Sequence, residues 1–181
     1  MDCDVIVRIA SFIDIAQIAK VHIQSWLETY PGIMPQRKLD SLNHESSERN
    51  WARTMESGGV FLVAEVEAEV VGFISGGENR SNEGCETGAG DACECELAAM
   101  YILREHHGKG VGKALYAAFT DRMVSLGYTS MVAWVAERNP ACGFYARMGG
   151  ERIDRRIINV MDTPVPVVAY RYAIGSGNRI E

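Results

Sequence analysis

His107-Gly108-Lys109-Gly110-Val111-Gly112-Lys113 is the stretch that decides the fold. It lies between a predicted strand, 93–103, and a predicted helix whose apolar side chains recur at helical spacing as far as Leu126. Glycines let a ligand approach the backbone closely, and the first N–H groups of a helix have no partner within it. These donors, the positive end of the helix dipole and two lysines together favour an anion, above all a phosphate.

Two common phosphate-binding patterns do not fit this stretch. A P-loop needs Gly-x-x-x-x-Gly-Lys-Ser/Thr, and that spacing is absent. A dinucleotide fingerprint needs a third Gly or Ala, but that position is Lys113 counted from Gly108 and Leu115 counted from Gly110. Glu137, at the end of the next predicted strand, would suit a ribose-binding acid, so a nicotinamide-dependent enzyme stays open as an alternative. A glycine-rich turn without a ligand is a further alternative.

Outward from this stretch, the pattern predicts one α/β domain with a mixed sheet, because it combines hairpins with helical crossovers. Residues 76–91 predict a loop, and Pro31, Gly32 and Pro35 break the first helix. We assign 1–175 to the domain and 176–181 to a frayed tail. Strands are expected at 5–9, 60–66, 70–75, 93–103, 129–135, 152–161 and 167–174, and helices at 14–27, 43–55, after Gly112 to Leu126, and from Asn139 to Met148.

Composition narrows the class of protein. The chain has 181 residues, 47% hydrophobic and 23% charged, as in a globular domain. A net charge of −6 argues against a nucleic-acid or membrane-surface partner, and no apolar run approaches the roughly 20 residues of a membrane span. The acidic start, Met1-Asp2-Cys3-Asp4, lacks the features of a signal peptide. Five cysteines are too few for a secreted disulfide scaffold, so we expect a reduced, cytoplasmic protein.

The cysteines do not predict a metal site. Cys85, Cys93 and Cys95 lack the C-x₂₋₄-C spacing of zinc ligands and have no second pair. A redox-sensitive pair at Cys93 and Cys95 stays open. His106 and His107 lie beside the glycine stretch, where polar or anion contacts are expected of them.

Three segments carry a family resemblance. His107 to Gly112 looks like a Gln/Arg-x-x-Gly-x-Gly/Ala signature, with His in place of Gln or Arg. Glu96 to Ile102 is similar to a Glu-Leu-x-x-Leu-Tyr-Val strand, and 139–150 resembles an Asn…Phe-Tyr…Gly motif. In this order the segments resemble the GNAT superfamily of acyl-CoA-dependent N-acetyltransferases over nearly the whole chain. The resemblance implies the GNAT fold, a mixed, splayed sheet of about seven strands flanked by about four helices.

The resemblance also implies a reaction, the direct transfer of the acetyl group of acetyl-CoA to a primary amine of a small molecule or peptide, without a metal. Pantetheine would add to the motif strand like a further strand, the pyrophosphate would bind the backbone amides from His107 to Lys113, and Asn139 would hydrogen-bond the cofactor arm. A homodimer is typical of the family. The implied cofactor-binding residues are Met100, Tyr101, Ile102, His107, Gly108, Lys109, Gly110, Val111, Gly112, Lys113 and Asn139.

The reaction has two proton transfers. An alkyl ammonium titrates near pH 10.4, so a base is needed at neutral pH, and Glu96 lies where several family members keep one. Tyr145 matches a tyrosine that family members use as the proton donor to the leaving thiolate. Trp26, Glu28 and Tyr30 belong to the region that lines the acceptor pocket in the family.

Each of these roles has a structural alternative. Glu96 and Glu28 also fit a solvated acidic surface, and the aromatic side chains also fit ordinary packing. A non-catalytic acyl-CoA-binding sensor is the alternative function. Polyamines, amino-acid derivatives, antibiotics and protein amines all stay open as acceptors, because fold does not fix substrate.

Overall fold

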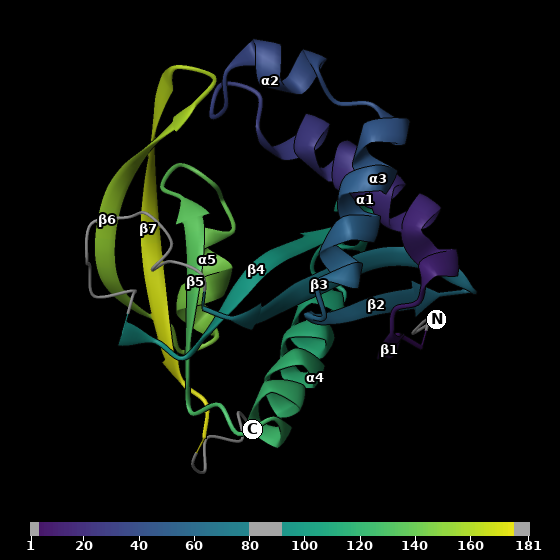
Figure 1. Ribbon diagram of the computed structural model, residues 1–181, viewed down its shortest axis with the longest axis vertical. Helices are drawn as coiled ribbons and strands as arrows, with labels where there is room; N and C mark the ends of the chain where they lie inside the picture. The colour runs from purple at the N-terminus through teal and green to yellow at the C-terminus, as the bar shows by residue number, and fades with distance from the viewer. Residues whose placement is uncertain (1–3, 80–91, 176–181) are drawn as a thin grey trace.

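The computed structural model describes residues 4–79 and 92–175. One mixed sheet has the strand order β1-β2-β3-β4-β5-β7-β6 (Figure 1), and its neighbouring strands are antiparallel except for the parallel pair β4–β5. The predicted mixed α/β fold with seven strands is confirmed. The predicted tail, 176–181, lies outside the described residues. The strands are β1 (Ile6–Ile9), β2 (Val60–Val66), β3 (Glu69–Glu78), β4 (Cys95–Ile102), β5 (Ser130–Ala136), β6 (Glu151–Val160) and β7 (Thr163–Ala173).

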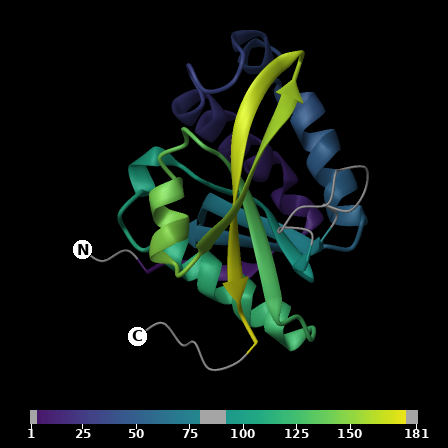
Figure 2. The ribbon, with the colours of Figure 1, turned by 90° about the vertical axis from the view of Figure 1, so that its left-hand side faces the viewer.

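Helices cover both faces of the sheet. On one face α1 (Ile15–Thr29) and α3 (His44–Glu56) pack together, and on the other lie α4 (Val111–Ser125) and α5 (Cys142–Arg147) (Figure 1). The sequence did not predict a fifth, short helix, α2 (Gln36–Asp40). Pro35, expected to act only as a breaker, is its N-cap, where a missing N–H costs nothing. The turn of the β6–β7 hairpin reaches α2 (Figure 2), where Arg37 pairs with Asp162 at 3.5 Å.

Residues 76–78 belong to β3 and not to the predicted loop. Gly76 pairs with Leu97, and Gly77 with Glu96. A Cβ at Gly76 would lie 2.0 Å from the carbonyl oxygen of Glu96, so the two strands come this close only because the residue is glycine. A composition typical of loops therefore marks a close backbone approach at this point.

Strand β7 begins at Thr163, earlier than the predicted start at Val167. Pro164 and Pro166 lie in this added first part of the strand. Both lie where β7 pairs with β6 alone, and pairing with β5 begins only at Val167. A proline is tolerated at such an edge because its missing N–H breaks no second ladder.

A bulge in β4 changes the direction of its side chains. Ser75 of β3 pairs with Ala99 and Gly76 pairs with Leu97, so Ala98 is an extra residue in the ladder. Leu97, before the bulge, packs in the core beneath α4, whereas Ala99, after it, packs on the α1–α3 side.

The sheet opens between its two parallel strands. Residues 95–97 of β4 pair with 131–133 of β5, and no further residues of these two strands pair in the described part of the chain. The expected splay between the strands on either side of α4 is therefore present. It leaves backbone groups of both strands facing a gap in the centre of the molecule.

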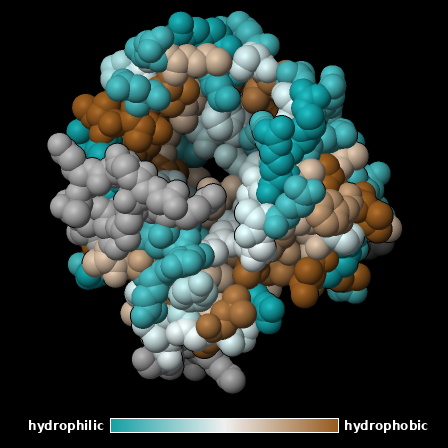
Figure 3. Space-filling model, viewed as in Figure 1, coloured by the Kyte–Doolittle hydropathy of each residue, from teal (hydrophilic) through white to brown (hydrophobic). Residues whose placement is uncertain are grey.

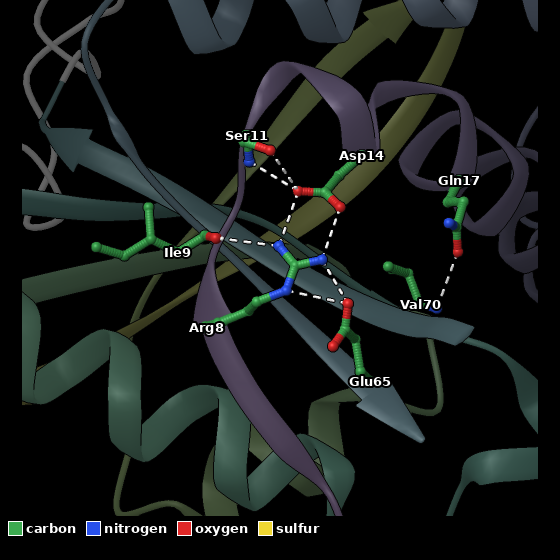
Figure 4. Close-up of polar contacts among 7 residues, drawn as sticks. All are labelled: Arg8, Ile9, Ser11, Asp14, Gln17, Glu65 and Val70. Atoms are coloured by element: carbon green, nitrogen blue, oxygen red, sulfur yellow. Dashed lines mark hydrogen bonds and ion pairs between the residues drawn. The ribbon is translucent and has the colours of Figure 1, made fainter. Parts of the chain in front are cut away.

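Arg8 ties β1 to β2 and to the start of α1 (Figure 4). Its guanidinium donates two hydrogen bonds to Asp14, at 2.8 and 2.9 Å, and its Nε donates to Glu65 at 3.0 Å. The same carboxylate of Asp14 accepts the N–H of Ser11 at 2.7 Å. The Arg8 hydrogen bonds are the main cause that lowers the pKa of buried Asp14 from 3.8 to about 2.

Replacing Asp14 should therefore change how stability depends on pH. Its folded pKa lies below the unfolded value, so the carboxylate stabilises the fold above about pH 4, and this contribution is lost as the pH falls towards 2. Asp14→Asn should lower the free energy of unfolding by about 1–2 kcal/mol at pH 7 and flatten its fall below pH 4. Urea unfolding at several pH values measures both effects. Asp121→Asn, on the exposed side of α4, is the control, and equal acid slopes for the two variants would contradict the assignment.

Candidate active site

A cavity of about 1020 Å³ occupies the gap between β4 and β5. Its walls come from the end of α1, from α2, from the start of α4, from α5 and from one side of β6. Figure 3 shows a hollow near the centre of the face that is also seen in Figure 1. A cavity of this size holds a ligand larger than a simple metabolite.

The three glycines of the deciding stretch have different roles. Gly108 and Gly110 are left-handed, with φ of +74° and +84°, and a Cβ at either would meet nothing within 4 Å. All three glycines line the cavity, and Gly108 and Gly110 leave open space at the start of α4. A Cβ at Gly112 would instead lie 3.2 Å from Ile102 and from Phe144. Gly112 is thus needed for packing, and Gly108 and Gly110 for the approach of a ligand.

Cations gather at this end of the cavity. Lys113, Arg104 and Arg147 line it, together with the N-terminus of α4. Two of the predicted cofactor-binding residues do not direct their side chains into the cavity. Lys109 is exposed outside the lining, and the side chain of Val111 is buried in the core. Val111 can therefore contact a phosphate through its backbone N–H and not through its side chain. We call this region the cofactor end.

His107 holds the loop onto β4. Its Nε2 lies 2.9 Å from the carbonyl oxygen of Ile102, which also accepts the hydroxyl of Ser25 at 3.3 Å. A carbonyl oxygen can only accept a hydrogen bond, so Nε2 of His107 carries the hydrogen and donates it. The carbonyl of Ile102 thus has both lone pairs occupied, and His107 uses one ring nitrogen within the fold.

Backbone groups of β4 point into the gap in alternation. The N–H of Leu103 donates to Val71 of β3, so by the antiparallel pattern Tyr101 also directs its backbone to β3. Met100 and Ile102 then direct theirs towards the gap. Of the three predicted backbone contacts, Met100 offers an N–H and a carbonyl, Ile102 offers its N–H, and Tyr101 lines the cavity with its side chain.

Asn139 bridges the two sides of the gap. Its Nδ2 donates to the hydroxyl of Tyr30 at 3.2 Å, and its Oδ1 accepts the N–H of Ala141 at 2.8 Å. The ring of Tyr30 in turn lies 4.6 Å from that of Trp26. The amide joins the end of α1 to the start of α5, and one hydrogen of Nδ2 remains for a ligand.

Tyr145 lies buried on α5 and lines the cavity. Its backbone carbonyl accepts the hydroxyl of Tyr172 at 2.9 Å and the N–H of Gly150 at 3.1 Å. Burial raises the pKa of the Tyr145 phenol above 10, so the side chain is a hydrogen-bond donor at neutral pH. Its position and protonation both suit a donor to a leaving group.

The two carboxylates predicted for the site are placed differently. Glu96 pairs with Gly77 in the middle of the sheet and precedes Leu97, the first residue of β4 in the lining. Glu28 lines the cavity, and its Oε1 accepts Nε2 of Gln24 at 3.1 Å. A proton moving from the cavity to Glu96 would therefore have to pass through water.

The opposite end of the cavity contains residues that sequence reasoning missed. Lys38 lies 5.8 Å from the ring centre of Trp26, and Arg156 lies 3.8 Å from that of Trp134. We call this region the acceptor end. The signal available in the sequence was the strand alternation of Arg156, Ile158 and Val160, which places all three on one side of β6. The acceptor end is lined by Trp26, Met34, Lys38, Trp134, Arg156, Ile158 and Val160.

Three further findings concern the residues that the structure describes. They contain no group of three or more His, Cys, Asp or Glu side chains placed to hold a metal, and Cys85 lies outside them. Cys93 and Cys95 are buried, free thiols. No helix in 4–79 or 92–175 is long and apolar enough to cross a membrane.

Free backbone on one side of a split sheet, with open space at a helix N-terminus, suits a thioester carried on a nucleotide, the donor substrate of an acyltransferase. Residues 21–150 match the model of the family described as the acetyltransferase (GNAT) family. The chain therefore belongs to the GNAT acetyltransferase family, and the resemblance seen in its motifs is confirmed.

Known proteins agree with this assignment. The chain is 38% identical over 149 residues to the uncharacterised N-acetyltransferase YuaI of Bacillus subtilis, covering 82% of each chain. YncA from Salmonella typhimurium, determined with its cofactor acetyl-CoA, has a TM-score of 0.70 at 19% identity, with 98% of each chain covered. The PaiA N-acetyltransferase from Thermoplasma acidophilum, in complex with coenzyme A, has a TM-score of 0.66 at 19% identity, covering 93% of this chain and 99% of that one. None of these comparisons supports the non-catalytic alternative.

The different roles of the glycines can be separated by substitution. Asn tolerates a left-handed backbone, so Gly110→Asn should keep the fold but fill the open space and weaken CoA binding at least tenfold. Gly112→Val should instead lower the melting temperature, because it displaces Ile102 and Phe144. Calorimetry with CoA and thermal melts measure the two effects.

The control is Gly127→Asn, since Gly127 is also left-handed, at +94°, but lies after the far end of α4. CoA affinity that is equal in Gly110→Asn and Gly127→Asn would contradict a phosphate site at Gly110.

Proposed function

We propose that the protein transfers the acetyl group of acetyl-CoA to a primary amine of a small molecule or peptide. The observation that carries the proposal is the cavity between β4 and β5, which runs from open left-handed glycines at α4 to an aromatic acceptor end. Membership in the acetyltransferase family supports the same reaction. The amine attacks the thioester directly, so both substrates meet in one cavity.

The cofactor end fits acetyl-CoA. Arg104, Lys113 and Arg147 supply positive charge for its phosphates, and the backbone of Met100 supplies a donor and an acceptor for its amide-bearing arm. Bound acetyl-CoA supplies the activated acetyl group. Asn139 holds α5, and with it Tyr145, in place across the gap.

Tyr145 donates a hydrogen bond to the sulfur that leaves. A thiol near pKa 8.5 is a stronger acid than a buried tyrosine, so the phenol stabilises the thiolate without giving up its proton early. Its charge-assisted hydrogen bond is stronger in the dry cavity than it would be in water.

Glu96 accepts the proton of the incoming ammonium through water. An alkyl ammonium has a pKa near 10.4, so removing its proton at neutral pH costs about 4–5 kcal/mol. A carboxylate that is connected to the amine through water lowers this cost. Its support is the place of Glu96, next to the bulge at which β4 enters the cavity wall.

The protein acts in the cytoplasm as a homodimer. Buried free thiols at Cys93 and Cys95 support a reducing compartment. Strand β6 is the last strand of the sheet, so its outer edge is available for another chain. Exposed Ile157 and Met161, 59% and 42% accessible, add apolar surface beside that edge.

Thiol release from acetyl-CoA, followed with a panel of primary amines, tests the reaction and Tyr145 together. The native protein should release thiol only when an amine is present. Tyr145→Phe should lower kcat about ten- to hundredfold, because a hydrogen bond to a charged group is worth about 1.5–3 kcal/mol. KM for acetyl-CoA should stay nearly unchanged, since the sulfur gains charge only along the reaction.

The control for Tyr145 is Tyr128→Phe, a partly exposed tyrosine outside the cavity lining. Full turnover by Tyr145→Phe with a good acceptor would make Tyr145 a packing residue. Absence of thiol release with every amine would contradict the reaction itself.

Glu96→Gln should lower turnover at neutral pH and recover as the pH rises, because the amine then loses its proton without help. Glu94→Gln is the control, two residues earlier in the chain and just before β4. It should keep the native pH–rate profile, since the carboxylate of Glu94 accepts the N–H of Thr129 outside the cavity. The pH dependence of kcat/KM measures both. Superimposable profiles for Glu96→Gln and the native protein would remove Glu96 from the reaction.

A further inference from the structure

We infer that the acceptor is an aminoacyl group, in which the amine and a carbonyl are joined to the same carbon, as in an amino-acid amide or at the N-terminus of a peptide. Two backbone groups on the edge of β5 that faces the gap bind it. The carbonyl of Trp134 accepts a hydrogen bond from the amine, and the N–H of Ala136 donates one to the carbonyl. The inference rests on the proposed acetyl transfer and narrows the class of its acceptor.

Alternate residues of β5 direct their backbone groups to the gap. The N–H of Glu137, directly after β5, donates to the carbonyl of Pro166 in β7 at 2.9 Å. The register between β5 and β7 is unbroken over 130–136, so the odd-numbered residues of β5 direct their backbone groups to β7 in the same way. The even-numbered residues, among them Trp134 and Ala136, therefore direct theirs to β4 or to the gap.

A residue of β4 bridges the preceding groups of β5. Leu97 is the partner of Ala133 in the parallel ladder. Because Ala133 directs its own backbone groups to β7, the N–H of Leu97 donates to the carbonyl of Val132, and its carbonyl accepts the N–H of Trp134. One aminoacyl unit of the chain thus spans two backbone groups of β5.

The bulge in β4 leaves the next two groups of β5 without a strand. In a regular ladder Ala99 would bond the carbonyl of Trp134 and the N–H of Ala136. Ala99 instead pairs with Ser75 of β3, and β4 turns away from β5 (Figure 1). In the described part of the chain no strand pairs with these two groups, and both residues line the cavity.

An aminoacyl group has the spacing that these two groups need. It would bridge Trp134 and Ala136 as Leu97 bridges the pair before them. A neutral primary amine has two hydrogens, so a hydrogen bond to the carbonyl of Trp134 leaves its lone pair for the thioester. A simple alkyl amine would leave the N–H of buried Ala136 without a partner, which weakens its binding.

The carbonyl of Trp134 lies at the narrow end of the gap. A cofactor whose phosphates bind at α4 runs along Ile102 and Met100 of β4 towards the bulge, so its thioester lies at this end in the proposed reaction. Trp134 directly follows the last residue of β5 that pairs with β4. An amine held by its carbonyl is therefore brought to the thioester.

The acidity of an aminoacyl ammonium also suits this site, because Glu96 is reached only through water. An α-amino group of this kind titrates near pH 7.7–8.0, whereas an alkyl ammonium titrates near 10.4. At pH 7 about one in ten of the former is a free amine, and about one in 2500 of the latter. An aminoacyl acceptor needs far less help from a base.

Matched acceptors test the carbonyl. We would measure thiol release from acetyl-CoA with the amides and methyl esters of L-alanine, L-leucine and L-phenylalanine, and with the corresponding amino alcohols, in which a CH₂ group replaces the carbonyl. Rates are expressed per free amine, which removes the difference in pKa. For at least one side chain, kcat/KM of the amide and of the ester should exceed that of the alcohol about tenfold or more. Equal values for the amide, ester and alcohol in every set would overturn the inference.

Tripeptide amides that begin with the same residues distinguish the two sources of an aminoacyl group. A kcat/KM above that of the amino-acid amide supports a peptide N-terminus as the acceptor. A value equal to or below it supports a small amino-acid derivative.

Ala136→Pro removes the N–H without breaking the pairing with β7, because this N–H faces the gap. The ratio of kcat/KM for the amide to that for the alcohol should fall about tenfold, and KM for acetyl-CoA should not change. Ala133→Pro is the matched control, since its N–H is directed to β7, and it should melt well below Ala136→Pro. A higher KM for acetyl-CoA in Ala136→Pro, with the ratio unchanged, would assign the group to the cofactor arm and overturn the inference.

A binding experiment on the native protein separates this inference from the proposed reaction and needs no variant. The N-acetylated amides keep both the N–H and the carbonyl of the aminoacyl group, and the N-acetylated alcohols lack this carbonyl. In the presence of CoA, calorimetry should show at least one acetylated amide binding about tenfold tighter than its alcohol. That result supports the inference even where no amine is acetylated, an outcome that would contradict the reaction alone. Equal affinities, or no binding of any acetylated amide, would overturn the inference.

Discussion

The gap between β4 and β5 is the constraint on which the rest of the structure depends. Unpaired backbone in the middle of a sheet is costly, because a buried N–H or carbonyl without a partner loses its hydrogen bond to water. The protein satisfies part of this backbone itself, with Ser25 and His107 on the carbonyl of Ile102. It leaves Met100 facing the cavity. A ligand with alternating amide groups can satisfy what remains, so the same divergence that weakens the sheet creates the site for the cofactor arm.

The charged side chains of the cavity lie at its two ends, and uncharged phenols lie between them. Burial raises the pKa values of Tyr30, Tyr101 and Tyr145, so three neutral phenols occupy the middle of the cavity. Cations stand at both ends, near α4 and near α2 and β6. Neutral donors at the centre stabilise a charge that appears only during the reaction without binding an ion beforehand. The Asn139 bridge between Tyr30 and α5 keeps these phenols at a fixed separation across the gap.

The sequence predicted the cofactor end better than the acceptor end, for a physical reason. The glycine stretch, Met100 and Asn139 lie in short motifs whose chemistry is local, so their neighbours in the chain are also their neighbours in space. Lys38 and Arg156 line the same cavity from α2 and from β6, elements far apart in the chain. Helix α2 has five residues, too few for a periodic pattern, and its N-cap proline resembled a breaker. The different role of Gly112 was also hidden, because its helical backbone and its packing against Ile102 and Phe144 distinguish it from Gly110 only in the folded structure.

The charges of the acceptor end bear on the first proton transfer as well as on binding. A cation near a second ionisable group favours the neutral form of that group when the group is itself cationic. Burial, and after it the charge of Lys38, lowers the pKa of His22 to about 4, so its imidazole is neutral at physiological pH. An ammonium held between the acceptor end and the thioester feels the same field, and each unit by which its pKa falls removes about 1.4 kcal/mol from the cost of forming the free amine. The cations of the acceptor end thus favour the neutral amine that attacks the thioester in the proposed reaction. In the proposed reaction this effect reduces the demand on Glu96, which stands behind the cavity wall and is reached only through water.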